Sequence, residues 1–222
     1  MTSKPAARST PWAIIALGAV LGFGAYLLFV SGDPLPFDES WEEFARVEPG
    51  SVAFGIAGFL AEVGSKFGAG ACGAITAALL LAIRERREAG AVITALIVGV
   101  ALSELLKLLV DRQRPIDLLY SVSGSSYPSG HSMGAAALAV SLAFAVSTIH
   151  HHSGVPVSRS SVRWAWLAAW AWVLAMMWSR TALGVHWLSD AIAGAALGTA
   201  VAVLATRVWG RPRGITQGYD SH

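Results

Sequence analysis

Long apolar stretches alternate with short polar ones along almost the whole chain. A helix needs about 20 mostly apolar residues to cross a bilayer, and somewhat fewer when polar flanks reach the interface. Six segments meet this requirement: Trp12–Val30, Phe67–Ile83, Ala91–Val110, Ser132–Ile149, Trp164–Trp178 and Leu188–Val208. The pattern therefore predicts an all-α bundle of six transmembrane helices, in which residues 1–222 form a single membrane-embedded domain.

The stretch between the first two predicted spans, residues 31–66, has a different pattern. Its first part is acidic. Its second part, Ser51–Leu60, is apolar but too short to cross a bilayer before Glu62 and Lys66 interrupt it. We expect helices in this stretch that lie at the outer membrane interface or fold back against the bundle.

The composition agrees with a membrane protein. Of the 222 residues, 55% are hydrophobic and 14% are charged, whereas soluble domains carry about 25% charged residues. The formal net charge of +2 is too small to indicate nucleic-acid binding. The one cysteine, Cys72, excludes an intramolecular disulfide and a cysteine-based zinc site. Gly and Ala recur in the last predicted span, which indicates close packing between helices.

The distribution of Lys and Arg predicts which ends of the spans face the cytoplasm, because cytoplasmic loops carry an excess of these residues. When the N-terminal tail 1–11 is placed inside, the inside segments hold most of the cations. These are Lys4, Arg8, Arg84, Arg86, Arg87, Arg159, Arg163, Arg207, Arg211 and Arg213. The acidic segment 31–66 then falls outside and the C-terminal tail 209–222 falls inside. We therefore predict a multi-pass cell-membrane protein with cytoplasmic termini.

Polar residues concentrate in three short motifs at the ends of predicted spans. The motifs are Lys107 with Arg114-Pro115, Tyr127-Pro128-Ser129-Gly130-His131, and Ser179-Arg180 with His186 and Asp190. Charged groups are costly beside lipid, so their clustering marks a functional site. On the predicted topology all three motifs lie on the outer, periplasmic or extracellular side.

Together, the three motifs resemble the signature of the type-2 phosphatidic acid phosphatase family, also called the lipid phosphate phosphatases. The order of the motifs, their internal spacings and their placement at span ends all match. The six predicted spans favour the integral-membrane bacterial members over the soluble vanadium haloperoxidases, which share the signature. The resemblance implies that His186 is a nucleophile that forms a phosphohistidine, and that His131 protonates the leaving alkoxide and then activates water.

The residue types explain why such a site suits a phosphate group. Lys107, Arg114 and Arg180 supply three cations, and arginine binds phosphate oxygens bidentately. Ser129 and Gly130 precede the fourth predicted span, so we expect their backbone N–H groups to face the anion. These five residues form the predicted phosphate-binding set.

The proton chemistry is assigned to the two histidines and a carboxylate. His186 and Asp190 are four residues apart and share a face if a helix begins near His186. A carboxylate there bonds one ring nitrogen and leaves the other free to attack phosphorus. No cluster of metal-binding carboxylates accompanies these residues, so we predict catalysis without a metal or another cofactor.

Several neighbouring residues receive supporting or structural interpretations. Glu104, three residues before Lys107, is the expected partner of that lysine, and Ser179 is expected to support the site from beside Arg180. Asp111 and Arg112 are interpreted as a solvated surface pair. The tract His150-His151-His152 is interpreted as a solvated loop, because adjacent residues do not share a helix face.

The sequence thus predicts a membrane phosphatase that acts on lipid phosphates such as phosphatidic acid or phosphatidylglycerol phosphate. Undecaprenyl diphosphate is the alternative substrate. Gly130, where some isoprenyl-diphosphate members carry Asp, and the presence of Lys107 favour glycerophospholipid monoesters. A lipid-phosphate binding or transport protein without activity is the alternative of another class, and haloperoxidase chemistry with bound vanadate is a third. The oligomeric state and the physiological lipid stay open.

Overall fold

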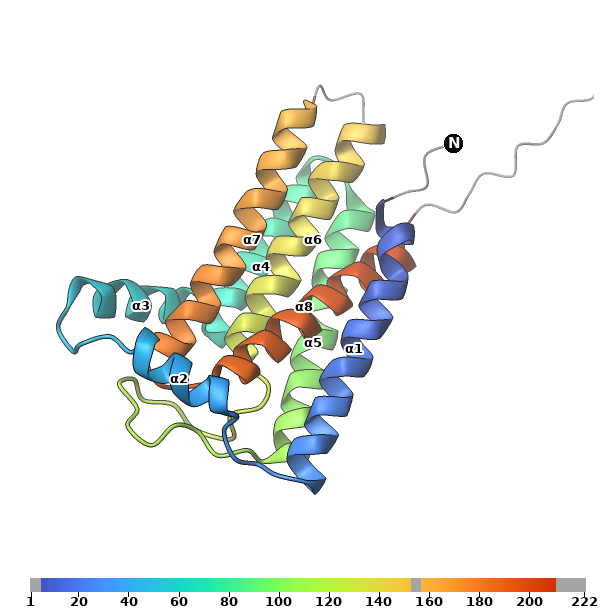
Figure 1. Cartoon of the computed structure of the whole chain (residues 1–222). Helices are drawn as coiled ribbons and strands as arrows, with labels where there is room; N and C mark the ends of the chain where they lie inside the picture. The colour runs from blue at the N-terminus through green and yellow to red at the C-terminus, as the bar shows by residue number, and fades with distance from the viewer. Residues whose placement is uncertain (1–4, 153–156, 211–222) are drawn as a thin grey trace, which may run out of the picture.

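A computed structural model describes residues 5–152 and 157–210, and this part of the chain is helical throughout, without a strand (Figure 1). The helices are α1 (Pro5–Phe29), α2 (Pro36–Ala45), α3 (Val52–Val63), α4 (Lys66–Ala82), α5 (Arg86–Val110), α6 (Gly130–His152), α7 (Arg159–Ala182) and α8 (Leu188–Trp209). All six predicted spans are helices, which confirms the all-α class. The predicted loop at residues 150–152 is the end of α6 instead, and the side chains there lie outside the described part of the structure.

Four of these helices are long and apolar enough to cross a membrane: α1, α5, α6 and α8. A fifth crossing arises if α3 and α4 count as one span, since together they meet the same criteria although they are bent by 61° at their junction. By itself α4 has 17 residues, and α7 contains several tryptophans and arginines. The number of six spans therefore stays a prediction.

The centre of the bundle is the contact between α6 and α8. In the most apolar 18-residue stretch of each helix, 67% of the residues of α6 and 72% of those of α8 are buried. The corresponding share in α1 is 22%. A Cβ atom at Gly194 would lie 2.3 Å from the carbonyl oxygen of Ser129, and one at Gly198 would lie 2.2 Å from that of Met133. Only glycine permits such an approach between backbones. The glycines of the last span therefore serve close packing within the chain, as predicted.

The segment between α1 and α4 folds back against the bundle. Helix α2 contacts α7 and α8, and α3 packs on α7. Ser51 and Ser65 are the N-cap residues of α3 and α4. Each side chain accepts a hydrogen bond from a backbone N–H in the first turn of its helix. Val52, Ile56 and Phe59 on the other side of α3 are exposed. This arrangement agrees with the expected interfacial or folded-back helices.

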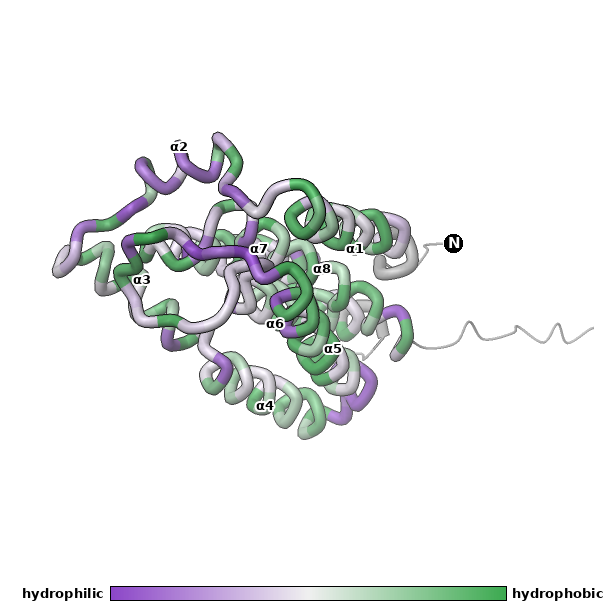
Figure 2. The backbone as a smooth tube through the Cα atoms, turned by 90° about the horizontal axis from the view of Figure 1, so that it is seen from below, coloured by the Kyte–Doolittle hydropathy of each residue, from purple (hydrophilic) through white to green (hydrophobic). Residues whose placement is uncertain are grey.

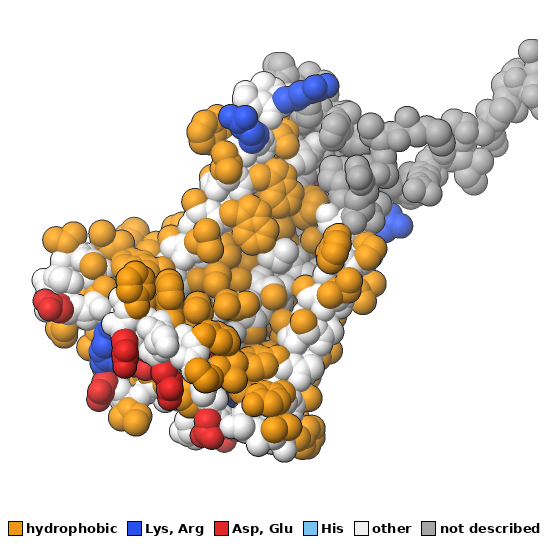
Figure 3. Space-filling model, in the orientation of Figure 1, with side chains coloured by type: hydrophobic (Ala, Val, Ile, Leu, Met, Phe, Trp, Pro, Cys, Tyr) orange, Lys and Arg blue, Asp and Glu red, His pale blue; other side chains and the backbone are white. Residues whose placement is uncertain are grey.

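The two ends of the bundle differ in polarity. The first residue of α1 and the last of α8 lie at one end, and the connections α1–α2, α5–α6 and α7–α8 lie at the other (Figure 1). At this second end, α2 and the α5–α6 connection contain many hydrophilic residues (Figure 2). On the face shown in Figure 3, acidic side chains gather at this end and apolar side chains cover the middle. The three polar motifs are therefore collected at the end away from the termini.

The close crossing of α6 and α8 predicts a strong dependence on Gly198. Replacing Gly198 with Ala forces its Cβ against the backbone of α6, so we expect a loss of about 1–3 kcal/mol of stability. The midpoint of thermal unfolding in detergent measures this loss. Gly18→Ala is the matched control, because no atom lies within 4 Å of the added Cβ. Equal midpoints for the two variants would contradict the packing argument.

Candidate active site

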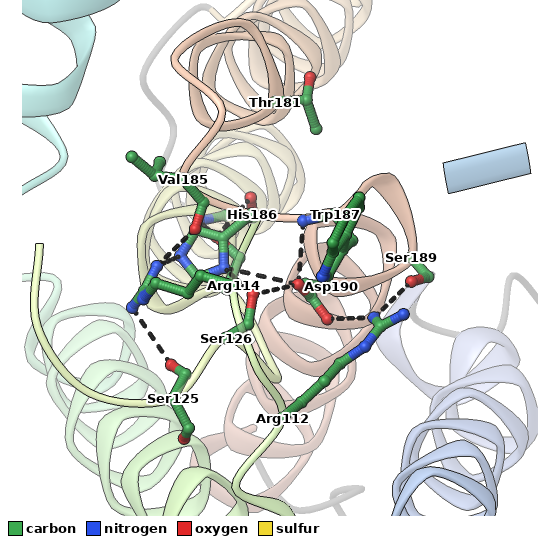
Figure 4. Close-up of polar contacts among 12 residues, drawn as sticks. Arg112, Arg114, Ser125, Ser126, Thr181, Val185, His186, Trp187, Ser189 and Asp190 are labelled. Carbon is green, nitrogen blue, oxygen red and sulfur yellow. Dashed lines mark hydrogen bonds and ion pairs between the residues drawn. The ribbon is translucent and has the colours of Figure 1, made fainter. Parts of the chain in front are cut away.

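His186 lies in the α7–α8 connection beside the guanidinium of Arg114 from the α5–α6 connection (Figure 4). Nη1 of Arg114 is 3.2 Å from Nε2 of His186. Arg114 also donates to the backbone carbonyl oxygens of Val185, Gly124 and Ser125. These bonds fix the guanidinium in place, so two motifs that are 72 residues apart meet at one ring nitrogen.

Asp190, in the first turn of α8, reaches His186 in part through Ser126. Oδ2 of Asp190 lies 3.8 Å from Nδ1 of His186, which is an ion-pair distance rather than a hydrogen bond. The hydroxyl of Ser126 lies 3.4 Å from the same Nδ1 and donates to Oδ2 of Asp190. The backbone N–H of Trp187 donates to Oδ2 at 3.0 Å. Sequence reasoning missed Ser126, although it directly precedes the second motif.

These contacts define the tautomer of His186. Because the guanidinium of Arg114 only donates, Nε2 carries the lone pair and Nδ1 carries the proton. Burial lowers the pKa of His186 to about 4; Asp190 opposes this change, while Arg114 and Arg180 add to it. His186 is therefore a neutral imidazole whose Nε2 lone pair points to the guanidinium of Arg114.

Arg180, near the end of α7, is completely buried, and its three guanidinium nitrogens have no hydrogen-bond partner among the described residues. The ring of Tyr120 covers it at 5.7 Å from the guanidinium carbon, and the Tyr120 hydroxyl donates to the carboxylate of Glu62. Buried polar groups in native proteins are almost always satisfied. The donors of Arg180 therefore suit an anionic ligand.

His131 and Lys107 line the same region from α6 and α5. The charges of Arg180, His186 and Lys107 all act on His131, whose Nε2 lies 3.1 Å from the carbonyl oxygen of Ala61. Since that oxygen only accepts, Nε2 carries a proton and Nδ1 is the other ring nitrogen available for chemistry.

Lys107 has the partner that the sequence predicted. Its Nζ lies 3.0 Å from Oε1 of Glu104. A Cβ added at Gly130 would lie 3.3 Å from the same Nζ. The ammonium group therefore lies directly against the first residue of α6.

Two predicted residues have other contacts than expected. The N–H of Ser129 donates to the carbonyl oxygen of Asp190 at 3.0 Å, so it does not face an anion. The first-turn N–H groups of Gly130 and His131 are those that a helix leaves without partners of its own. The hydroxyl of Ser179 donates to the carbonyl oxygen of Ala57 and joins α7 to α3, so Ser179 supports the helix packing rather than the site directly.

The interpretation of Arg112 as a solvated surface residue is wrong, whereas Asp111 is exposed as expected. The side chain of Arg112 is fully buried. Its guanidinium bonds Oδ1 of Asp190 at 2.6 Å and Oδ2 of Asp38 at 3.0 Å. Sequence reasoning missed the contact between Arg112 and Asp38. Asp38 lies far upstream, within an acidic segment whose composition is typical of a solvated surface.

Among the described residues, no group of three or more His, Cys, Asp or Glu side chains is arranged to hold a metal ion.

The family model of the PAP2 superfamily matches residues 88–213, which include all three motifs. The chain belongs to the PAP2 superfamily. This confirms the family that the motifs indicated. The matched region begins in α5, so α1–α4 lie outside it. Taken with the apolar helices, the membership identifies a multi-pass membrane protein.

Two solved structures share the fold of this chain. The PAP2-type phosphatidylglycerolphosphate phosphatase from Bacillus subtilis is similar with a TM-score of 0.75 and 20% identity, over 88% of this chain and 94% of that chain. LpxE from Aquifex aeolicus gives a TM-score of 0.61 and 17% identity, over 78% of this chain and 96% of that chain.

A relative in Sulfolobus acidocaldarius, described as an undecaprenyl-diphosphatase, is 26% identical over 141 residues. The match covers 60% of this chain and 61% of that protein.

The lowered pKa of His186 predicts that its ring stays neutral at about pH 5.5, where a histidine of ordinary pKa near 6.5 is mostly protonated. Nitrogen-15 NMR of histidine-labelled protein in detergent, with His186→Gln for assignment, reports the protonation state. Because the unfolded chain binds the proton more tightly, His186 also makes stability fall as the pH drops from about 6.5 to 4. A doubly protonated His186 ring at pH 5.5 would contradict this description.

Proposed function

We propose that this protein is a membrane lipid phosphate phosphatase that works through a phosphohistidine on His186, without a metal. The observation that carries the proposal is the guanidinium of Arg180, which is buried without a hydrogen-bond partner in the described structure. It lies close enough to both histidines for its charge to act on them. A dianionic phosphoryl group supplies the acceptors that this guanidinium lacks.

The proposed reaction uses the ring nitrogens that the contacts leave available. Nε2 of His186 attacks phosphorus, and Ser126 and Asp190 stabilise the proton on Nδ1. The P–O bond to the lipid breaks, and the leaving oxygen takes a proton from Nδ1 of His131, which has received that proton from the bound phosphate monoanion while Nε2 keeps its own. Water, deprotonated by His131, then cleaves the phosphohistidine and releases phosphate. Arg114, Arg180 and Lys107 stabilise the charge of the transferred group.

Two substrate classes have support. The presence of Gly130 and Lys107 favours glycerophospholipid monoesters, and the chain shares its fold with a phosphatidylglycerolphosphate phosphatase. Undecaprenyl diphosphate is the second candidate, since the relative from Sulfolobus acidocaldarius is described as acting on it. The paired histidines argue against a lipid-phosphate binder or transporter, which needs cations but no nucleophile. The membrane fold makes haloperoxidase chemistry with vanadate the least favoured alternative.

The proposal predicts that purified protein releases phosphate in EDTA from phosphatidic acid, phosphatidylglycerol phosphate or undecaprenyl diphosphate in detergent. His186→Ala should lower turnover at least about a thousandfold, because the nucleophile is lost. His131→Ala should lower it about 100- to 10,000-fold, and far less for an aryl phosphate whose leaving group needs no proton.

Ser160→Ala, at the other end of the bundle, is the control and should leave turnover unchanged. A wild-type protein that binds these lipids without releasing phosphate would support the binding function instead. Activity that is lost in EDTA and restored by a divalent ion would reveal a missed metal.

We also propose that the site faces the outer side of the membrane, with both termini in the cytoplasm. Arg159 and Arg163 begin α7 at the end away from the site, and α2 places acidic residues at the site end. The positive-inside rule favours this orientation. An interfacial site also avoids the cost of about 2.5–3.5 kcal/mol for each Lys or Arg at the bilayer centre.

Cysteine labelling in intact cells, in a Cys72→Ser background, tests the orientation. Ser121 and Ser160 are both exposed and lie at opposite ends of the bundle. We expect an impermeant reagent to label Ser121→Cys in intact cells and Ser160→Cys only after lysis. The reverse pattern would place the site on the cytoplasmic leaflet.

A further inference from the structure

Arg112 is held between two buried carboxylates that come from distant parts of the chain. Asp38 lies in α2 and Asp190 in α8, and both side chains are fully buried, as is that of Arg112. Ser189 completes the group. Its hydroxyl and its N–H both lie 2.7 Å from oxygens of Asp38, and the hydroxyl also lies 2.7 Å from Nη1 of Arg112. Arg112, Asp38, Asp190 and Ser189 thus form a closed polar network.

Within this network, Arg112 binds the oxygen of Asp190 that does not face His186. Oδ1 of Asp190 binds Arg112, and Oδ2 receives Ser126 and Trp187 and faces His186 (Figure 4). The orientation of Oδ2, and with it the proton on Nδ1 of His186, therefore depends on the position of Arg112. That position depends in turn on Asp38, which shares the guanidinium.

We propose that Arg112 and Asp38 are positioning residues for the reaction, acting through Asp190 on His186. The inference rests on the proposed phosphatase function and deepens it. Asp38 lies outside the region that the family model matches, so α2 supplies part of the site that the three motifs do not contain. The group touches none of the phosphate-binding cations, so its effect falls on turnover and leaves substrate binding unchanged.

Charge balance gives the proposal a specific signature. Without Arg112, two buried carboxylates remain with no cation between them, and one of them takes up a proton. When Asp190 is the protonated one, His186 loses its anionic partner. Removing the charge of Asp38 as well leaves Asp190 as the single carboxylate of the network. Loss of Asp38 should therefore impair the wild-type enzyme but improve an enzyme that already lacks Arg112.

The test compares Asp38→Asn, Arg112→Met and the double variant in phosphatidic acid hydrolysis in detergent. We expect kcat to fall about tenfold in Asp38→Asn and about a hundredfold in Arg112→Met, with KM within about twofold of wild type. The double variant should be at least about threefold more active than Arg112→Met. Glu39→Gln removes the same charge from the neighbouring, exposed residue of α2 and should behave as wild type.

Nitrogen-15 NMR of His186 provides a second measurement that needs no activity. In wild type the proton should stay on Nδ1, and in folded Asp38→Asn both tautomers should appear, while the His131 signals stay unchanged. If Arg112→Met does not fold, Arg112→Lys replaces it, since one ammonium group cannot bridge both carboxylates. Inactive wild-type protein would contradict the proposed function, and the tautomer comparison still tests the present proposal.

Two results would overturn the proposal. One is a folded Asp38→Asn enzyme with wild-type kcat and an unchanged His186 tautomer. The other is a double variant that is no more active than Arg112→Met, because the two residues would then not share a charge balance.

Discussion

The site depends on how the charge of Arg112 is neutralised away from water. A buried guanidinium is tolerated only when carboxylates and hydrogen-bond acceptors surround it, and removing one partner costs about 3–5 kcal/mol. Here the partners come from α2, from α8 and from the backbone between α1 and α2. The same contacts therefore anchor α2 and the α1–α2 connection to the bundle and hold one oxygen of Asp190.

Arg180 shows the opposite situation. It is as deeply buried as Arg112, yet its guanidinium has only the face of Tyr120 and no hydrogen-bond acceptor in the described structure. The guanidinium of Arg112 is satisfied by the protein, whereas the donors of Arg180 stay unpaired among the described residues. Two arginines of similar burial are thus distinguished by their partners, and of the two only Arg180 has donors that suit an anionic ligand.

Helix packing determines how closely these groups approach each other. Gly194 and Gly198 let α8 cross α6 at backbone contact, so the start of α6 lies against the first turns of α8. Ser129 then bonds the carbonyl oxygen of Asp190 and fixes the relative position of the two motifs. The bend between α3 and α4 brings Ala61 over His131.

The sequence by itself determined the helical class, the six apolar segments and the three motifs, because hydropathy and residue spacing are local properties. It also identified the Lys107–Glu104 pair, which lies within one helix turn. Only the tertiary structure decided the burial and the contacts of Arg112, Asp38 and Ser126. Their burial depends on contacts between segments up to 151 residues apart, and a charged residue in a loop has the same local pattern whether it is solvated or enclosed by carboxylates.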